Sequence, residues 1–503
     1  MDNFYFNLSG GINQSSTKTE LGLSTKNIYW SDAENIEIYQ SKGITRQKGN
    51  LLLKSLPESK EIIGIHEMKN GAKCRLLIAT KDGKFYIYND NKEIQVINKE
   101  HHSKKILFVN FLNGTIVAGN NDEIFFIKNN DNNDVVDCNL KDSSNKPVFA
   151  SAITVYKGRV WVSSGSTIYF SALGKYDDFS TENDAGYIND FHTNTDEIIA
   201  LKTYKDFLAI YKEDSTYLLS GSTTEDFAII PFADKGAYSQ GGIVSVNNKQ
   251  YFYSSGIYSL QVGDLNQIML GNEITNSIKK EFDKFDKSRR NEVFALNYER
   301  RNQVWYFIPY EKDNYFHTIW INDLVHNAWY KRVLPQDITT ACIFEKSIIT
   351  ADKNGNLYRE DINNSFNGKP IEFIWKSPFL SLGSPTVRKT IDEFYFILDE
   401  SCENNFTYSI FKNYDSESQD DKDTIYSTNT ENLIWSNENS PDYLNDTWSD
   451  ETNEAIWALG AESMYKAEIS EANYAIQLCV EGNKLENNLA IIGIQFKEIY
   501  CED

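Results

Sequence analysis

The chain has 503 residues and a net charge of −22, and its six cysteines are scattered singly, with no Cys-x-x-Cys pair. This spacing argues against a disulfide framework or a zinc knuckle, and such acidity argues against binding the nucleic-acid backbone, because phosphates would be repelled. Tyr and Phe number 30 and 29 against 9 Pro, and long helical periodicities are hard to find, so an all-β protein with free thiols is expected.

The N-terminal segment 1–60 precedes the first regular repeat. It lacks the basic and apolar regions of a signal peptide, and no stretch of the chain reaches the roughly 18 to 20 consecutive apolar residues of a membrane span. We therefore expect synthesis in the cytoplasm and no membrane span. The segment 1–60 either closes the repeat array that follows or contacts a neighbouring subunit.

A strand-rich unit repeats between residues 61 and 362. Each unit has an apolar strand, a tight turn and then a hairpin such as RVWVSSGSTIYFSAL at 159–173. The turns recur every 42 to 54 residues, at Gly71, Gly114, Gly158, Asp206, Asn248, Asn302 and Lys346. Because a four-stranded propeller blade takes about 40 to 50 residues and cannot bury its faces alone, seven such units predict a seven-bladed β-propeller.

The outer strand of a blade is the least regular part of the pattern. After the third hairpin comes a polar connection, 174–196, without a clear strand, and the seventh unit has no obvious outer strand of its own. Either 34–40 (ENIEIYQ) or 371–375 (IEFIW) could fill that seventh position. The best helical candidate is 274–288, with Ile278, Phe282 and Phe285 on one side.

Beyond residue 363 the strands become longer, which predicts an antiparallel β-sandwich at 363–503. Residues 401–503 carry 21 Asp and Glu against 5 Lys, a local net charge of −16. Between the sandwich strands lies an acidic excursion with aromatic residues, and we expect it to face a partner or the lumen of a ring. The candidate contact residues are Trp435, Asp442, Tyr443, Asp446, Trp448, Asp450, Glu451 and Glu454.

Enzyme motifs are missing from this pattern. A sialidase-like propeller needs an arginine cluster, but there are only ten arginines, and Arg289-Arg290 and Arg300-Arg301 are adjacent pairs. The six histidines show no His-Glu-x-x-His spacing, and no phosphate-binding glycine loop or Gly-x-Ser-x-Gly occurs. We therefore expect no catalytic residues, no metal and no cofactor.

The N-terminal segment and two later stretches resemble a known family. The N-terminal positions that match are Gly10, Gly11, Asn13, Asn35, Tyr39, Gly43, Arg46 and Gly49. The later stretches are 235–261, which contains a Gly-Ile-Tyr turn, and 375–396, where the propeller would join the sandwich. Together they resemble the tail nozzle and tail stabilisation proteins of short-tailed phages and related propeller components of other virion tails.

The resemblance implies a structural protein of the virion tail, acting as a nozzle or head-to-tail connector. It implies a homo-oligomer, typically a hexameric ring, that contacts tail adaptor or portal proteins and tail fibres. Double-stranded DNA would pass through the ring during genome ejection without sequence-specific binding, and an acidic lumen would repel it rather than hold it. The chain is compact for a nozzle, which leaves its position along the tail open. The alternatives are a propeller tail protein that binds a receptor or glycan, using Trp435, Tyr443 and Trp448, and, third, a propeller glycoside hydrolase.

Overall fold

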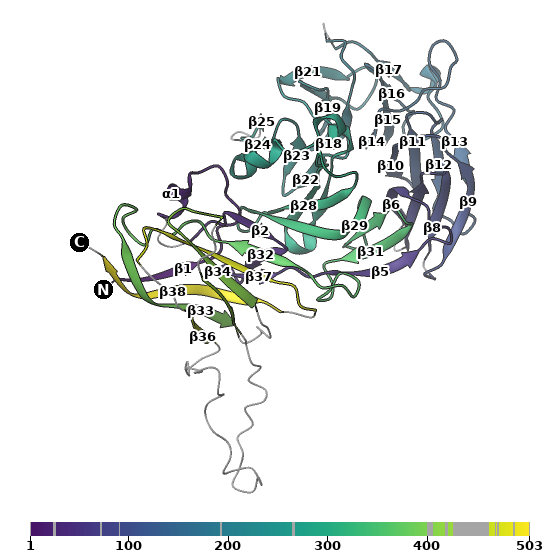
Figure 1. Cartoon of the computed structure of the whole chain (residues 1–503). Coiled ribbons are helices and arrows are strands. Elements are labelled where there is room, and N and C mark those ends of the chain that lie inside the picture. Colours follow the sequence, from purple (N-terminus) through teal and green to yellow (C-terminus); the bar gives the residue numbers. More distant parts are fainter. Residues whose placement is uncertain are drawn as a thin grey trace.

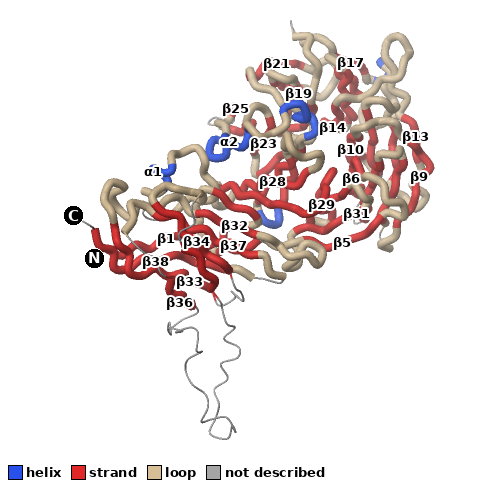
Figure 2. Tube along the Cα trace, in the orientation of Figure 1, coloured by secondary structure: helices blue, strands red, loops and turns tan. Residues whose placement is uncertain are grey.

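The computed structural model describes residues 2–23, 27–70, 73–89, 91–191, 194–263, 267–399, 406–417, 421–425, 462–467, 469, 472–485 and 488–501. Strands dominate these residues and form a seven-bladed propeller beside a β-sandwich (Figures 1 and 2). In Figure 1 the blades occupy the upper right and the sandwich the lower left, and both ends of the chain lie in the sandwich. The predicted all-β fold of propeller and sandwich is confirmed.

Each of the first five blades is a four-stranded antiparallel sheet whose strands follow in chain order. Blades one and two consist of β6 (Ile62–Asn70), β7 (Lys73–Thr80), β8 (Lys84–Tyr88) and β9 (Ile94–Glu100), then β10 (Ile106–Phe111), β11 (Gly114–Gly119), β12 (Phe125–Lys128) and β13 (Val135–Asp137). Blades three and four consist of β14 (Ala152–Tyr156), β15 (Arg159–Ser164), β16 (Thr167–Phe170) and β17 (Gly186–Ile188), then β18 (Ala200–Tyr204), β19 (Phe207–Tyr211), β20 (Thr216–Ser220) and β21 (Ala228–Ala233). Blade five consists of β22 (Ile243–Val246), β23 (Lys249–Tyr253), β24 (Ile257–Val262) and β25 (Ile268–Leu270).

Successive side chains of each strand point to opposite faces of its sheet, and apolar side chains on these faces hold neighbouring blades together. Leu77 of blade one packs with Val117 and Phe125 of blade two, and Trp161 of blade three packs with Leu208 of blade four. These side chains are almost fully buried, and burial of each large apolar side chain contributes roughly 1.5 to 3 kcal/mol. The sheets therefore stabilise one another side by side, as the repeat pattern predicts.

Blades six and seven share one long strand. Blade six consists of β26 (Phe294–Tyr298), β27 (Gln303–Phe307), β28 (Phe316–Asp323) and the first part of β29 (Ala328–Phe344). The second part of β29 is the first strand of blade seven and pairs with β30 (Ser347–Asp352), which pairs with β31 (Asn356–Glu360). β29 also lies against β6, so the last blade contacts the first.

The outer strand of blade seven comes from the N-terminal segment. It is β5 (Asn50–Ser55), which pairs antiparallel with β31. Both strands suggested by the sequence are wrong, because 34–40 contains β3 and 371–375 contains β32, and each pairs within the sandwich. The segment 1–60 therefore closes its own propeller. The outer strand missing from the pattern of blade three is the short strand β17, which lies inside the polar connection.

The sandwich is built from both ends of the chain. One sheet contains β1 (Asp2–Asn7), β3 (Ile36–Tyr39), β4 (Gly43–Arg46), β33 (Lys389–Asp399), β36 (Glu462–Ala467) and β38 (Ala490–Cys501). The other contains β2 (Asp32–Glu34), β32 (Phe373–Lys376), β34 (Phe406–Lys412), β35 (Asp421–Ile425) and β37 (Ile476–Gly482). Their facing aromatic rings meet at Phe394 and Tyr408, whose centroids are 5.9 Å apart.

The second sandwich sheet continues the sheet of blade six. β2 pairs with β32 on one side and makes a parallel bridge, Glu34 to Lys331, with β29 on the other. One path of hydrogen-bonded strands therefore runs from β26, the inner strand of blade six, to β35 at the far edge of the sandwich. This continuity fixes the sandwich at the rim of the ring.

Helical structure is confined to short pieces in the described residues. They are α1 (Lys18–Leu21), α2 (Lys279–Phe282) and the 3-10 helices η1 (Thr181–Asn183), η3 (Asn276–Ile278), η4 (Lys287–Glu292) and η5 (Glu299–Arg301). The single helix expected at 274–288 is wrong, although Ile278 and Phe285 are buried as its pattern indicated. Asp286 accepts a hydrogen bond from the backbone N–H of Ser288 and starts a new turn there. None of these pieces has the length or apolar character needed to cross a bilayer.

Candidate functional site

The eight predicted contact residues, Trp435, Asp442, Tyr443, Asp446, Trp448, Asp450, Glu451 and Glu454, lie outside the described residues. Their proposed role therefore stays a prediction. The best-defined polar centre in the described part of the chain is instead the joint where the N-terminal segment, blades six and seven and the sandwich meet.

Residues of the N-terminal motif lie at this joint. The side chain of Asn35, at φ 55°, donates to the carbonyl of Glu372 (2.8 Å) and accepts from the backbone N–H of Val333 (2.8 Å). Asn35 thus ties the sandwich to blade six. Arg46 is buried and donates to the carbonyl of Asn364 (3.2 Å), and burial lowers the pKa of this guanidinium to about 10.

The motif glycines allow close backbone approach. A Cβ on Gly10 would lie 2.4 Å from the carbonyl oxygen of Ile28, and one on Gly43 would lie 2.1 Å from that of Ile491. A Cβ on Gly49 would lie 1.9 Å from the carbonyl oxygen of Ser365. Each distance is far below van der Waals contact with rigid backbone, so a larger residue would push the N-terminal segment away from its neighbours.

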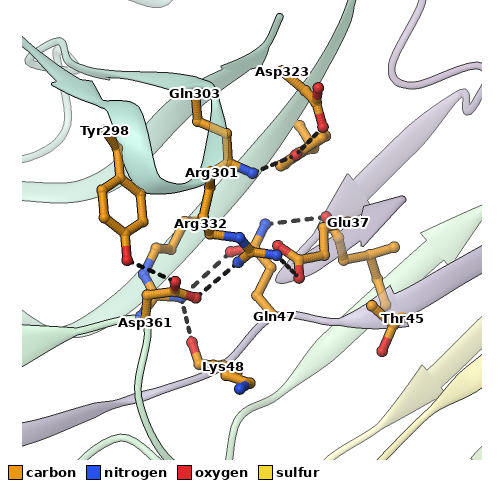
Figure 3. A network of polar contacts seen from close by, with 12 residues as sticks. Glu37, Thr45, Gln47, Lys48, Tyr298, Arg301, Gln303, Asp323, Arg332 and Asp361 are labelled. Carbon is orange, nitrogen blue, oxygen red and sulfur yellow. Dashed lines mark hydrogen bonds and ion pairs between the residues drawn. The ribbon is translucent and has the colours of Figure 1, made fainter. Parts of the chain in front are cut away.

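An ion triad crosses the joint (Figure 3). Arg301, in the turn of blade six, donates to Glu37 of β3 (2.6 Å) and to Asp361 after β31 (2.8 Å). The hydroxyl of Tyr298 donates to the other oxygen of Asp361 (2.9 Å). The guanidinium therefore links the sandwich, blade six and blade seven.

Burial and charge act in opposite directions within this triad. Burial alone would lower the pKa of Arg301, but the charges of Glu37 and Asp361 outweigh it and raise that pKa. Burial raises the pKa of Glu37, and Arg301 opposes that shift. Burial together with Asp361 raises the pKa of Tyr298 to about 12, which keeps its hydroxyl as a donor. Arg301 therefore stays charged between two carboxyl groups.

A buried ion pair, Arg332 and Glu360, contacts the start of β5. Arg332 and Glu360 have side chains only 1% and 0% exposed, and their charged groups are 2.6 Å apart. Arg332 also donates to the carbonyls of Lys48 (2.6 Å) and Gly49 (3.1 Å), and Glu360 accepts from the side-chain amide of Asn50 (3.0 Å). These bonds hold the N-terminal segment where it enters blade seven.

A chain of buried hydrogen bonds leads from this joint into blade six. Trp305 donates its indole N–H to Gln303 (3.1 Å), Gln303 donates to the hydroxyl of Tyr330 (2.8 Å), and Tyr330 donates to Asp323 (2.9 Å). All four side chains are buried. Satisfied buried networks of this kind make an arrangement rigid, because breaking one bond leaves a desolvated group unpaired.

Two pockets lie away from the joint. One, of about 490 Å³, opens among the turns of blades four to six and is lined by Tyr204, Lys205, Asn248, Asn297 and Glu299 among others. Lys205 donates to the side chain of Asn248 there (2.5 Å). The other, of about 470 Å³, lies between the outer strands of blades three and four and includes the half-exposed Tyr187.

The described residues contain no group of three His, Cys, Asp or Glu residues placed to hold a metal ion. The described cysteines, Cys74, Cys138, Cys342, Cys479 and Cys501, are all free. Burial raises the pKa of Cys138 to about 12 and that of Cys479 to about 11, so these two remain protonated thiols at neutral pH.

No protein-family model and no curated protein matches the chain. Among solved structures, the computationally designed Ika8 protein is 10% identical with a TM-score of 0.39, covering 62% of this chain and 100% of its own. The Pan2 WD40 domain of Neurospora crassa is 10% identical with a TM-score of 0.41, covering 65% and 98%. BBS1N, solved in complex with ARL6DN, is 10% identical with a TM-score of 0.38, covering 64% and 99%.

The joint was only partly visible in the sequence. The family resemblance marks Asn35, Gly43, Arg46 and Gly49 in the sequence, but it does not mark their charged neighbours. Arg301 stands out there only as part of an adjacent arginine pair. Its carboxylate partners lie 264 and 60 residues away in the chain, and no local pattern marks a contact over such separations.

Proposed function

We propose that this chain is a structural protein of a phage tail that assembles into a ring and forms part of the channel for genome ejection. The observation that carries the proposal is the N-terminal motif of eight residues, which resembles tail nozzle and stabilisation proteins. The packing of its glycines and of Asn35 and Arg46 at the joint supports it, since these residues have a definite role in a propeller that carries a sandwich.

The charge of the chain supports a channel that repels DNA. The net charge is −22, of which −16 lies in residues 401–503. A ring that presents such a surface to its lumen would not bind the phosphates of a duplex, so the duplex could slide. The predicted partners are further copies of the chain, a portal or tail adaptor protein, and tail fibres.

Electron microscopy of the purified protein, alone and mixed with a portal or adaptor protein, tests the proposal. Rings of several copies with an axial hole, sixfold in the expected case, support a tail channel protein. Persistent monomers under both conditions overturn it.

The acidic excursion can be tested by neutralisation. Changing Asp442, Asp446, Asp450, Glu451 and Glu454 to their amides should leave folding intact and lower infectivity or docking. The matched control neutralises five exposed propeller carboxylates, Glu123, Glu182, Glu225, Asp283 and Glu311. Equal infectivity of the two variants would contradict a special role for the excursion.

A receptor- or glycan-binding tail protein is the second candidate. The polar pocket of about 490 Å³ favours it, because amide, ammonium and carboxylate groups from three blades converge there. Retention of the monomeric protein on a glycan array, lost on Asn248→Ala, would support this reading. No retention on any glycan would contradict it.

A further inference from the structure

A serine, a histidine and an aspartate meet in hydrogen-bonded order at the edge of the joint. Ser41 lies in the turn between β3 and β4, and its Oγ is 2.9 Å from Nε2 of His326. The other ring nitrogen of His326, Nδ1, is 3.0 Å from Oδ2 of Asp323. Asp323 ends β28 and His326 follows it in the turn before β29, whereas Ser41 comes from the sandwich.

The surroundings of Asp323 determine which ring nitrogen carries the proton. One carboxylate oxygen accepts the backbone N–H groups of Val325 (2.9 Å) and His326 (3.0 Å), and the other accepts the hydroxyl of Tyr330 (2.9 Å). Burial raises the pKa of Tyr330, so this hydroxyl stays a donor. Because an ionised carboxylate only accepts, Nδ1 must donate to it, and Nε2 is then the acceptor for the hydroxyl of Ser41.

This order is the relation of nucleophile, base and positioning group that activates serine in unrelated folds. The carboxylate is 9% exposed and held by four donors, while the imidazole is 21% exposed and Ser41 is exposed. Ser41 has a φ of 60°, in a turn closed by the N–H of Lys42 donating to the carbonyl of Tyr39 (3.1 Å). The hydroxyl is therefore presented to solvent on a tight turn, with its base behind it.

The site is open, and an exposed apolar residue precedes His326 in the chain. Val325, next to His326, is 63% exposed and offers an apolar surface for a short acyl chain. The backbone N–H of Ser41 donates to no other described residue, so it is available to a developing oxyanion. A single such donor predicts modest turnover, since each oxyanion donor typically contributes a factor of about 100 to 1,000.

We propose that Ser41 is the nucleophile of an acyl-transfer site that cleaves esters of short acyl groups, with His326 as general base and Asp323 as positioning residue. Ser41 Oγ attacks the ester carbonyl carbon as its proton passes to Nε2 of His326. The bond from that carbon to the alcohol oxygen then breaks, and the alcohol leaves with the proton from Nε2. Water attacks the acyl-serine in the same way and releases the carboxylic acid. This activity does not depend on the proposed tail function.

The first test is covalent labelling of the full-length protein. A fluorophosphonate probe followed by peptide mass spectrometry should modify Ser41, and p-nitrophenyl acetate should be hydrolysed. Ser41→Ala should abolish both signals, as should Ser41→Gly, which suits the positive φ and keeps the turn. Modification of other serines only, or unchanged hydrolysis in Ser41→Gly, would overturn the proposal.

The second test separates activation from simple exposure. His326→Gln should lower the labelling rate of Ser41 about 100-fold or more, the usual range for loss of a general base. The matched control is His102→Gln, because His102 is exposed and also contacts an aspartate, Asp122 (3.3 Å). Asp323→Asn should slow the labelling of Ser41. In a separate measurement, the fluorescence-detected unfolding midpoint of Ser41→Gly should equal that of the wild type. Equal labelling rates in wild type and His326→Gln would refute the assignment.

Discussion

Replacing Arg332 by methionine should destabilise the protein by about 3 to 5 kcal/mol, because Glu360 would keep a buried charge without a cation. The pair is 2.6 Å apart and at most 1% exposed. The carbonyl of Lys48 would also lose its donor, and that of Gly49 would keep only the backbone N–H of Ile362. Methionine keeps much of the apolar volume beside Trp305, whose ring lies 5.3 Å from the guanidinium, so the expected effect is mainly electrostatic.

The Arg332–Glu360 effect should be measured as a double-mutant cycle in urea. Glu360→Gln alone should cost a similar amount, and the double variant should be at least about 2 kcal/mol more stable than the sum of the single effects predicts. The control is the pair of Lys422 and Glu481, 2.8 Å apart, whose side chains are 51% and 36% exposed, and losing it should cost less than about 1 kcal/mol. Additive single effects, or a cost below about 1 kcal/mol for Arg332→Met, would refute the reasoning.

Three further perturbations test the ring and the joint. Burial lowers the pKa of His66 to about 4. The contribution of His66 to stability is therefore complete above its unfolded pKa and is lost, by at most about 3 kcal/mol, as pH falls from about 6.5 to 4. Urea unfolding of His66→Leu should show a flatter pH dependence in this range, and an unchanged slope would contradict this reasoning. Gly43→Ala should cost more than about 2 kcal/mol in urea unfolding, since its Cβ would lie 2.1 Å from a carbonyl, whereas Gly165→Ala, with a φ of 58° and open space, should cost only about 1 kcal/mol. Removing residues 1–60 should leave blade seven with three strands and yield no folded monomer by circular dichroism and gel filtration; a stable monomer would contradict this.

The blades could be predicted from the sequence because their information is local. Strands such as β14 and β15 pair with neighbours only a turn away, and Lys157 and Gly158, both at a positive φ, mark that turn. Apolar residues on both sides of these strands showed that each sheet is covered on two faces. Repetition of one local pattern was therefore enough to predict the ring.

The closing strand could not be predicted because its information is not local. β5 pairs with β31, and Leu51 lies opposite Arg359, about 300 residues further along the chain. The alternation in 34–40 was as good a strand signal, but Ile36 and Ile38 belong to the sandwich. The path of the backbone decides which strand occupies the outer edge of blade seven. The alternation of apolar residues in the sequence does not describe that path.

The polar joint was hidden for a related reason. Arg332 and Glu360 look like ordinary surface residues in the sequence, and only the meeting of β29 with β31 and β5 buries them. The contact of Ser41 with His326 likewise spans 285 residues. Local signals existed in Asp323 and His326, three residues apart after an apolar strand, but the serine that completes the group comes from another sheet.

The path of the chain makes the propeller and the sandwich interdependent. β1 to β4 build part of the sandwich before β5 closes blade seven, and β38 later inserts beside β1 and β4. The ring therefore lacks its closing strand, and the sandwich lacks four of its strands, until the N-terminal segment has packed against both. Because β2 also bridges β29 in one continuous sheet, bending at the joint would break the backbone pairing, the partly buried ion pairs of Arg301 and the buried pair of Arg332. A load applied to the sandwich is thus transmitted directly to blades six and seven.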